Sequence, residues 1–119
     1  QTRAPSLARA AFMETMAMHL SITLALADQC FIVGVFSRLD ELLSQPMPKA
    51  LANLNLAPEI SDALLRRKGP PATLLELAVL MESGDSGATD IVLAKLSIPA
   101  TLAEQSFSAA CTWADSLPA

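Results

Sequence analysis

Side chains that bind metals are scarce in this sequence. Among 119 residues there is one histidine, His19, and there are two cysteines, Cys30 and Cys111, far apart along the chain. Structural zinc sites use four such ligands at short spacings, so the sequence argues against zinc. A lone imidazole also lacks a neighbouring nucleophile, and we expect His19 to be a surface residue at a helix end. We expect no disulfide framework, and reduced, buried cysteines are typical of a cytoplasmic protein.

Glycine and positive charge are also in short supply. The four glycines are scattered, so the sequence contains no phosphate-binding loop. With a net charge of −4 and only one short basic run, at residues 66–68, we expect no nucleic-acid surface. No apolar run approaches the roughly 18 residues of a membrane-spanning helix, so we also expect no insertion into a membrane.

Apolar residues, by contrast, are abundant. They make up 52% of the chain, against 17% charged residues, which excludes a disordered protein. They recur at spacings of three and four, and no segment alternates with a period of two for long. We therefore predict one all-α domain over residues 1–119, a bundle of six or seven helices.

The most apolar stretch is residues 30–43, and we predict that it belongs to a central helix spanning about 25–44. Its first half is rich in Val, Ile and Phe, which would also suit a strand, but the pattern is too long for a typical strand. Gly34 lowers helix stability by roughly 1 kcal/mol relative to Ala, so we expect it to permit close packing against a neighbouring helix.

Capping and proline signals place the other elements. Pro5 begins a helix that runs to about Leu20, and Thr23 can cap the central helix. Another helix begins at Pro58, with Gly69 in its C-terminal capping position. Residues 69–71 are expected to be a rigid break before a helix at 73–81, which has almost no polar face of its own.

Three segments resemble a known family. Residues 27–40 are similar to the core helix of HD-superfamily proteins, in which an apolar run, a glycine and two apolar residues precede a His-Asp pair. Residues 54–65 and 69–77 resemble the second half of HDOD domains, most of all those that follow an EAL domain in bacterial cyclic di-GMP signalling proteins. HDOD domains are the non-catalytic branch of the superfamily. The resemblance covers about residues 9–117.

This resemblance implies that the chain is not an enzyme. Where metal-dependent HD phosphohydrolases have His-Asp, this sequence has Ser37-Arg38. Serine is a poor metal ligand and an arginine repels a cation, so we expect neither a metal nor another cofactor. The resemblance places the remains of the ancestral metal pocket, here called the vestigial HD pocket, at Ser37, Arg38 and Glu41.

The expected function is a non-catalytic regulatory and protein-interaction module linked to an upstream EAL domain. One alternative is an HD-type phosphohydrolase acting on a nucleotide. Another is a nucleotide sensor in which Arg38 binds a phosphate in the vacated pocket.

The chain begins with Gln1 and is shorter than HDOD domains, so we expect it to be the C-terminal portion of such a domain. The missing helices would leave an apolar face exposed, with the helix at 73–81 as the main candidate. We therefore expect this face to bind an upstream domain, a protein partner or a second copy of the chain in a dimer.

Overall fold

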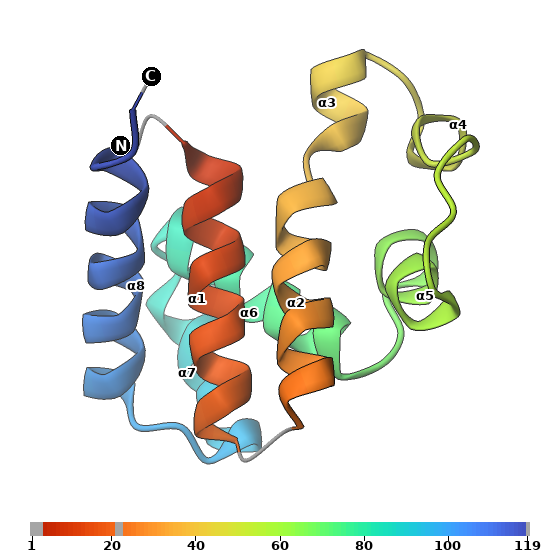
Figure 1. Cartoon of the computed structure of the whole chain (residues 1–119). Helices are drawn as coiled ribbons and strands as arrows, with labels where there is room; N and C mark the ends of the chain where they lie inside the picture. Colours follow the sequence, from red (N-terminus) through yellow and green to blue (C-terminus); the bar gives the residue numbers. More distant parts are fainter. Residues whose placement is uncertain (1–3, 21–22, 119) are drawn as a thin grey trace.

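The computed structural model describes residues 4–20 and 23–118, and within these residues the chain is all-helical, as predicted. Figure 1 shows the arrangement of the elements. In chain order the helices are α1 (Pro5–His19), α2 (Leu24–Phe36), α3 (Leu39–Leu43), α4 (Met47–Ala50), α5 (Pro58–Arg66), α6 (Pro70–Ser83), α7 (Ser86–Leu96) and α8 (Ala100–Asp115). None of the described helices has both the length and the apolar character needed to cross a membrane.

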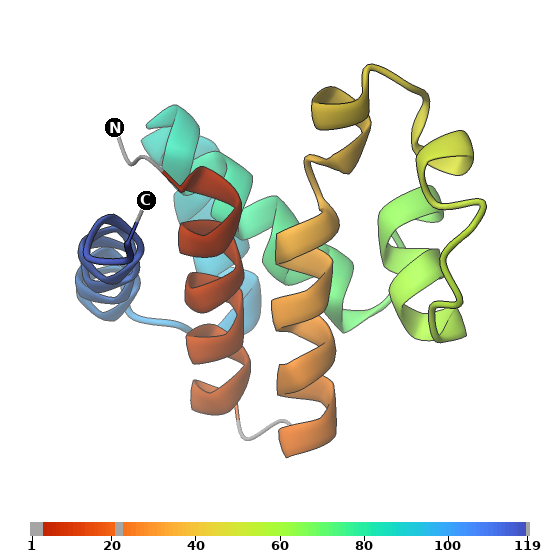
Figure 2. The same ribbon diagram turned by 45° about the horizontal axis from the view of Figure 1, so that its top comes forward.

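The antiparallel pair α1 and α2 forms the middle of the molecule. Helix α8 packs on one side of α1, α5 packs on the far side of α2, and α6 crosses behind both (Figures 1 and 2). The core therefore lies between the α1–α2 pair and α6. Its largest fully buried side chains include Phe12, Met13, Met16, Leu74 and Leu77.

Close packing of α1 on α2 depends on Gly34, as the sequence predicted. A Cβ atom built on Gly34 would lie 2.4 Å from the Cα of Ala10 and 2.8 Å from its backbone nitrogen. Carbon atoms in ordinary contact are about 3.5–4.0 Å apart, so no larger residue fits without separating the helices. The absent side chain is what lets the two backbones approach.

The prediction of one continuous central helix over residues 25–44 is wrong. Helix α2 ends at Phe36, residues 37–38 form a turn, and α3 continues from Leu39. The hydroxyl of Ser37 donates a hydrogen bond to the Gly34 carbonyl oxygen at 2.8 Å, while the Ser37 backbone N–H reaches the same carbonyl at 3.4 Å. This side-chain bond competes with the helical ladder and favours a break at this point.

Several helix ends follow the sequence signals. Helices α1 and α5 begin at Pro5 and Pro58, and the Thr23 hydroxyl accepts a hydrogen bond from the Leu26 backbone N–H. The prediction for Gly69 was wrong. Arg67 takes the left-handed conformation that ends α5, whereas Gly69, at φ 91°, is the residue before α6. Pro70 and Pro71 then form the first turn of α6 rather than a separate break, because proline suits that position.

Helix α6 does not have the exposed apolar face that the sequence predicted. Leu74, Leu75 and Leu77 are at most 1% exposed, and Val79 is the one large apolar residue of the helix that is well exposed, at 38%. The α1–α2 pair, α5 and α7 pack around it. The helices present in this chain therefore cover the face for which missing helices were expected.

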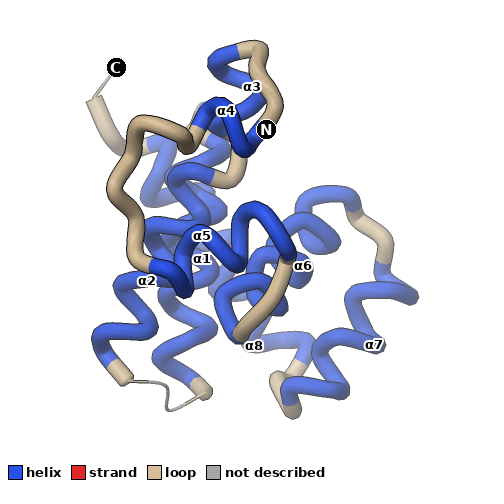
Figure 3. Tube along the Cα trace, turned by 90° about the vertical axis from the view of Figure 1, so that its right-hand side faces the viewer, coloured by secondary structure: helices blue, strands red, loops and turns tan. Residues whose placement is uncertain are grey.

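Large apolar side chains are exposed, among other places, beyond the end of α2. Helix α3 has no buried residue, and Leu42 and Leu43 are 72% and 50% exposed. Together with α4 and the loop that follows, α3 forms an arm over residues 39–57 that extends beyond the end of α2 and returns to α5 (Figure 3). We call this segment the α3–α4 arm.

Candidate functional site

A partly buried charge pair joins the first and sixth helices. The guanidinium of Arg9 donates from Nε to Glu82 Oε2 at 2.8 Å and from Nη2 to Glu82 Oε1 at 2.5 Å. The side chain of Arg9 is 8% exposed and that of Glu82 is 24% exposed. Two parallel bonds between a guanidinium and a carboxylate form the strongest type of side-chain ion pair, and here the pair fixes α1 against α6.

Ser37 is the third member of this network. Its hydroxyl accepts a hydrogen bond from Arg9 Nη1 at 2.8 Å and donates one to the Gly34 carbonyl oxygen at 2.8 Å. The residue is 9% exposed. Ser37 therefore connects the end of α2 to the Arg9–Glu82 pair, and its hydroxyl is fully engaged inside the protein.

Arg38 points to the same carboxylate but is held loosely. Its Nη2 lies 3.4 Å from Glu82 Oε1, and its Nη1 lies 3.3 Å from Glu41 Oε2. The Nε atom is buried and has no hydrogen-bond partner among the described residues. Because a buried donor without an acceptor costs free energy, Arg38 is the one under-satisfied cation in this network.

The three residues of the predicted vestigial HD pocket thus have different surroundings. Arg38 and Glu41 form an ion pair. The side chain of Arg38 is connected to that of Ser37 through Glu82 and Arg9. Glu41 has a 67% exposed side chain and lies at the rim. His19, expected at the surface, is exposed at the end of α1.

The sequence analysis singled out neither Arg9 nor Glu82. A signal for Arg9 existed. It lies three, four and seven residues before Phe12, Met13 and Met16, so a helical pattern places it on the buried face of α1. A charged residue on a buried face needs an opposite charge nearby, although the sequence does not say which one.

A pocket opens beside this network. It has a volume of about 590 Å³, and it is lined by the ends of α1, α6 and α8 and by the turn after α2. Its lining residues are Pro5, Ala8, Arg38, Glu82, Phe107, Cys111 and Asp115. We call it the Arg38 pocket. Its size lies within the range of small-molecule sites, and it combines an apolar wall with a few charged groups.

The two thiols have different environments. Burial raises the pKa of Cys30 to about 11, and its side chain faces the core from α2. Burial is also the main cause that raises the pKa of Cys111, followed by the negative charges of Asp115 and Glu82. Neither thiol is therefore activated as a nucleophile, because the thiolate is the reactive form.

The residues around Ser37 and Arg38 do not fit the metal centre of an HD phosphohydrolase. Within residues 4–20 and 23–118, no three His, Cys, Asp or Glu side chains gather as a metal site would require. Two guanidinium groups, those of Arg9 and Arg38, approach the Glu82 carboxylate. A divalent cation at this carboxylate would be repelled by both.

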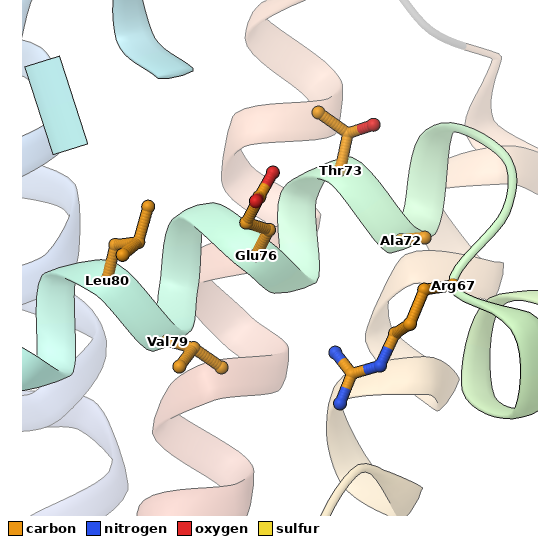
Figure 4. Close-up of a pocket in the computed structure, with 6 residues that line it drawn as sticks. All are labelled: Arg67, Ala72, Thr73, Glu76, Val79 and Leu80. Carbon is orange, nitrogen blue, oxygen red and sulfur yellow. The ribbon is translucent and has the colours of Figure 1, made fainter. Parts of the chain in front are cut away.

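A shallower pocket of about 320 Å³ lies along α6 and is lined by Arg67, Ala72, Thr73, Glu76, Val79 and Leu80. Figure 4 shows that Glu76 and Thr73 project from one side of α6 and Val79 from the other, while Arg67, at the end of α5, lies on the side of Val79. Because these polar groups diverge, they offer no common point at which a ligand could be bound.

The chain is similar to a cyclic di-GMP phosphodiesterase. Over 80 residues it is 40% identical to the "Cyclic di-GMP phosphodiesterase CdgJ" of Vibrio cholerae serotype O1. The match covers 67% of this chain but only 18% of the length of that protein. No family model and no solved structure matches the chain.

Proposed function

We propose that this chain is a non-catalytic regulatory and protein-interaction module of bacterial cyclic di-GMP signalling, of the HDOD type. It would modulate an EAL-type phosphodiesterase domain of the same polypeptide, in the cytoplasm. The similarity to CdgJ supports the signalling context, and the small share of CdgJ that is matched fits a module rather than a whole enzyme.

The proposal that the chain is non-catalytic rests on the network of hydrogen bonds and ion pairs at Ser37 and Arg38. At the position where the resemblance expects metal ligands, Ser37 is hydrogen-bonded to Arg9, and Arg9 is paired with Glu82. A hydrolase of the HD type needs carboxylates and imidazoles that are available to a cation. Here Glu82 neutralises Arg9 instead, and this charge pair fixes the packing of helices.

For the interaction surface we propose the α3–α4 arm. Leu42 and Leu43 are exposed there on a short helix with no buried residue, which is unfavourable unless another surface covers them. Because the match covers 18% of CdgJ, a protein built like CdgJ has most of its chain elsewhere, and we propose that this remaining chain is the partner.

The first test is the reaction itself. The chain is incubated with cyclic di-GMP and Mg²⁺ or Mn²⁺, and product is measured by chromatography. We expect no hydrolysis above the rate without protein. Turnover that depends on the cation and is lost in an Arg38→Ala variant would overturn the non-catalytic proposal.

The second test measures regulation. In CdgJ, the matching segment is replaced by this chain, and the phosphodiesterase rate of the chimera is compared with that of its Leu42→Glu variant. We expect the variant to change the rate without lowering the melting temperature.

Ile91→Glu is the control, because Ile91 is 66% exposed on α7, away from the arm. Equal effects of both substitutions, or none from either, would count against the arm as the interface. A chimera that dimerises through Leu42 would point to self-association instead.

A further inference from the structure

The turn between α2 and α3 separates two helices whose hydrogen-bonding groups match. Among the described residues, the backbone N–H groups of Arg38, Leu39 and Asp40 have no hydrogen-bond partner. In a continuous helix each of them would donate to the carbonyl oxygen four residues earlier. Those carbonyls belong to residues 34–36, in the last turn of α2, which ends without a following turn to pair with. The donors at the start of α3 and the acceptors at the end of α2 therefore fit one uninterrupted helix.

Joining the two helices mainly requires a rotation at Arg38. Ser37 is already in the helical region, at φ −64° and ψ −18°, whereas Arg38 is at φ −111° and ψ 11°. A helical residue has φ of about −63° and ψ of about −42°, so rotations of about 50° at Arg38 would suffice. The side chain of Arg38 opposes this movement weakly, because its contacts to Glu41 and Glu82 are long, at 3.3 and 3.4 Å.

The apolar residues also follow a single helix across the turn. Ile32, Phe36 and Leu39, at spacings of four and three, all pack against the core. Four residues further along the same stripe is Leu43, which is 50% exposed in the present form. A continuous helix would therefore keep Leu39 on the side of the core and place Leu43 on that side as well. The apolar surface that the α3–α4 arm presents would change.

The hydroxyl of Ser37 stabilises the break. It donates a hydrogen bond to the Gly34 carbonyl oxygen at 2.8 Å, and so competes for the acceptor that the Arg38 N–H would use in a continuous helix. The hydroxyl is itself held by Arg9 Nη1, at 2.8 Å, and Arg9 is paired with Glu82 of α6. The break therefore depends on an ion pair that lies outside the arm.

We propose that residues 37–38 are a hinge that switches between the present broken form and a continuous α2–α3 helix, and that the hydrogen bond from Arg9 to Ser37 holds the broken form. This inference rests on the proposed function, in which the α3–α4 arm is the interface. A partner that binds Leu42 and Leu43 more tightly in one form shifts the equilibrium toward that form. The hinge thus gives the regulatory module two states for a partner to select between.

Amide hydrogen exchange followed by NMR on the chain tests the hinge. We expect Ser37→Ala to favour the continuous helix, because it removes the competing hydroxyl and alanine has the highest helix propensity. Protection of the Arg38, Leu39 and Asp40 amides should rise by roughly tenfold or more over the parent. Ser108→Ala is the control, because Ser108 is exposed within α8 and its replacement gives the same gain in helix propensity. This control should leave the three amides unchanged.

Two results would refute the hinge. One is unchanged protection of these amides in folded Ser37→Ala. The other is loss of protection throughout α3, which would show that the helix melts instead of extending. If Ser37→Ala does not fold because Arg9 loses an acceptor, Ser37→Cys decides the question, since a thiol has a similar size but forms only weak hydrogen bonds.

The phosphodiesterase rate of the CdgJ chimera separates this inference from the proposed function. We expect Ser37→Ala to change the rate, as Leu42→Glu does, whereas Ser108→Ala should not. If Leu42→Glu alone changes the rate, the arm remains the interface and the hinge has no regulatory role, which refutes this inference. If Leu42→Glu has no effect, the proposed interface fails, and the exchange of the amides still decides whether the hinge exists.

Discussion

Replacing Gly34 by alanine tests how tightly α1 and α2 are packed. The added Cβ would lie 2.4 Å from Ala10 Cα, 2.8 Å from Ala10 N and 2.9 Å from Ala10 Cβ. Two of these atoms are backbone, so no side-chain rotation relieves the clash. The helices would have to separate by about 1 Å, because carbon atoms in contact prefer about 3.5–4.0 Å.

The expected magnitude is the difference between two opposing effects. Overpacking of a core costs about 1–3 kcal/mol, and the upper part of this range applies where backbone must move. Alanine returns roughly 1 kcal/mol through its better helix propensity. We therefore expect Gly34→Ala to lower the free energy of unfolding by about 1–2 kcal/mol. Gly34→Leu, with a larger side chain at the same point, should be at least as destabilising.

Thermal unfolding followed by circular dichroism measures the effect. For a domain of this size about 1 kcal/mol corresponds to roughly 4 °C, so the melting temperature should fall by about 4–8 °C. Gly87→Ala is the matched control. Gly87 lies in α7, and a Cβ there meets only Asp85 Oδ1, at 3.8 Å. This control should be neutral or slightly stabilising. A melting temperature of Gly34→Ala equal to or above that of the parent would refute the packing of α1 on α2 described above.

Three further predictions concern charge, pH and association. Glu82→Gln should destabilise the fold by about 2–3 kcal/mol in chemical denaturation, because it leaves the buried guanidinium of Arg9 without its counter-charge. Asp62→Asn, which removes one partner of an exposed ion pair, should change the stability by less than about 1 kcal/mol. Equal effects would contradict the burial of the first pair. Burial raises the pKa of Cys30 from 9.0 to about 11, so the thiol loses its proton at lower pH in the unfolded chain than in the folded one. This thiol should therefore not affect the free energy of unfolding below pH 9. Between pH 9 and 11 it should lower that free energy by about 1.4 kcal/mol per pH unit. The Cys30→Ala variant should not show this fall in stability with pH. The sequence has no tyrosine, so no phenol titrates in the same range. Light scattering after size exclusion should show that Leu42→Glu reduces any self-association of the chain, and a dimer that persists in this variant would place the contact away from the α3–α4 arm.

Local features of the sequence determined most of the helices. Prolines set the starts of α1 and α5, the Thr23 hydroxyl capped α2, and Gly34 indicated a close helix contact. The prolines and the capping hydroxyl act within one helix turn. Gly34 acts by having no side chain, which allows a neighbouring helix to come close. They can therefore be recognised without knowing which helices pack together.

Only the tertiary structure decided the site. Arg9 and Glu82 are 73 residues apart, and no local pattern specifies that the end of α6 brings a carboxylate to the buried face of α1. The same network explains the break at Ser37, whose hydroxyl bonds Gly34 and Arg9 at once. Apolar periodicity alone predicted a continuous helix there, because it records which residues are apolar and not where a distant charge pair will lie.

The exposed surface was likewise decided by packing. The composition of residues 73–81 suggested an uncovered face, but the α1–α2 pair, α5 and α7 cover it in the folded chain. Leu42 and Leu43 of α3, which a helical pattern assigned to the core, are exposed, whereas Leu39 at the start of α3 still packs against the core. The sequence determined how much apolar surface the chain has, whereas the order in which helices pack determined where it remains exposed.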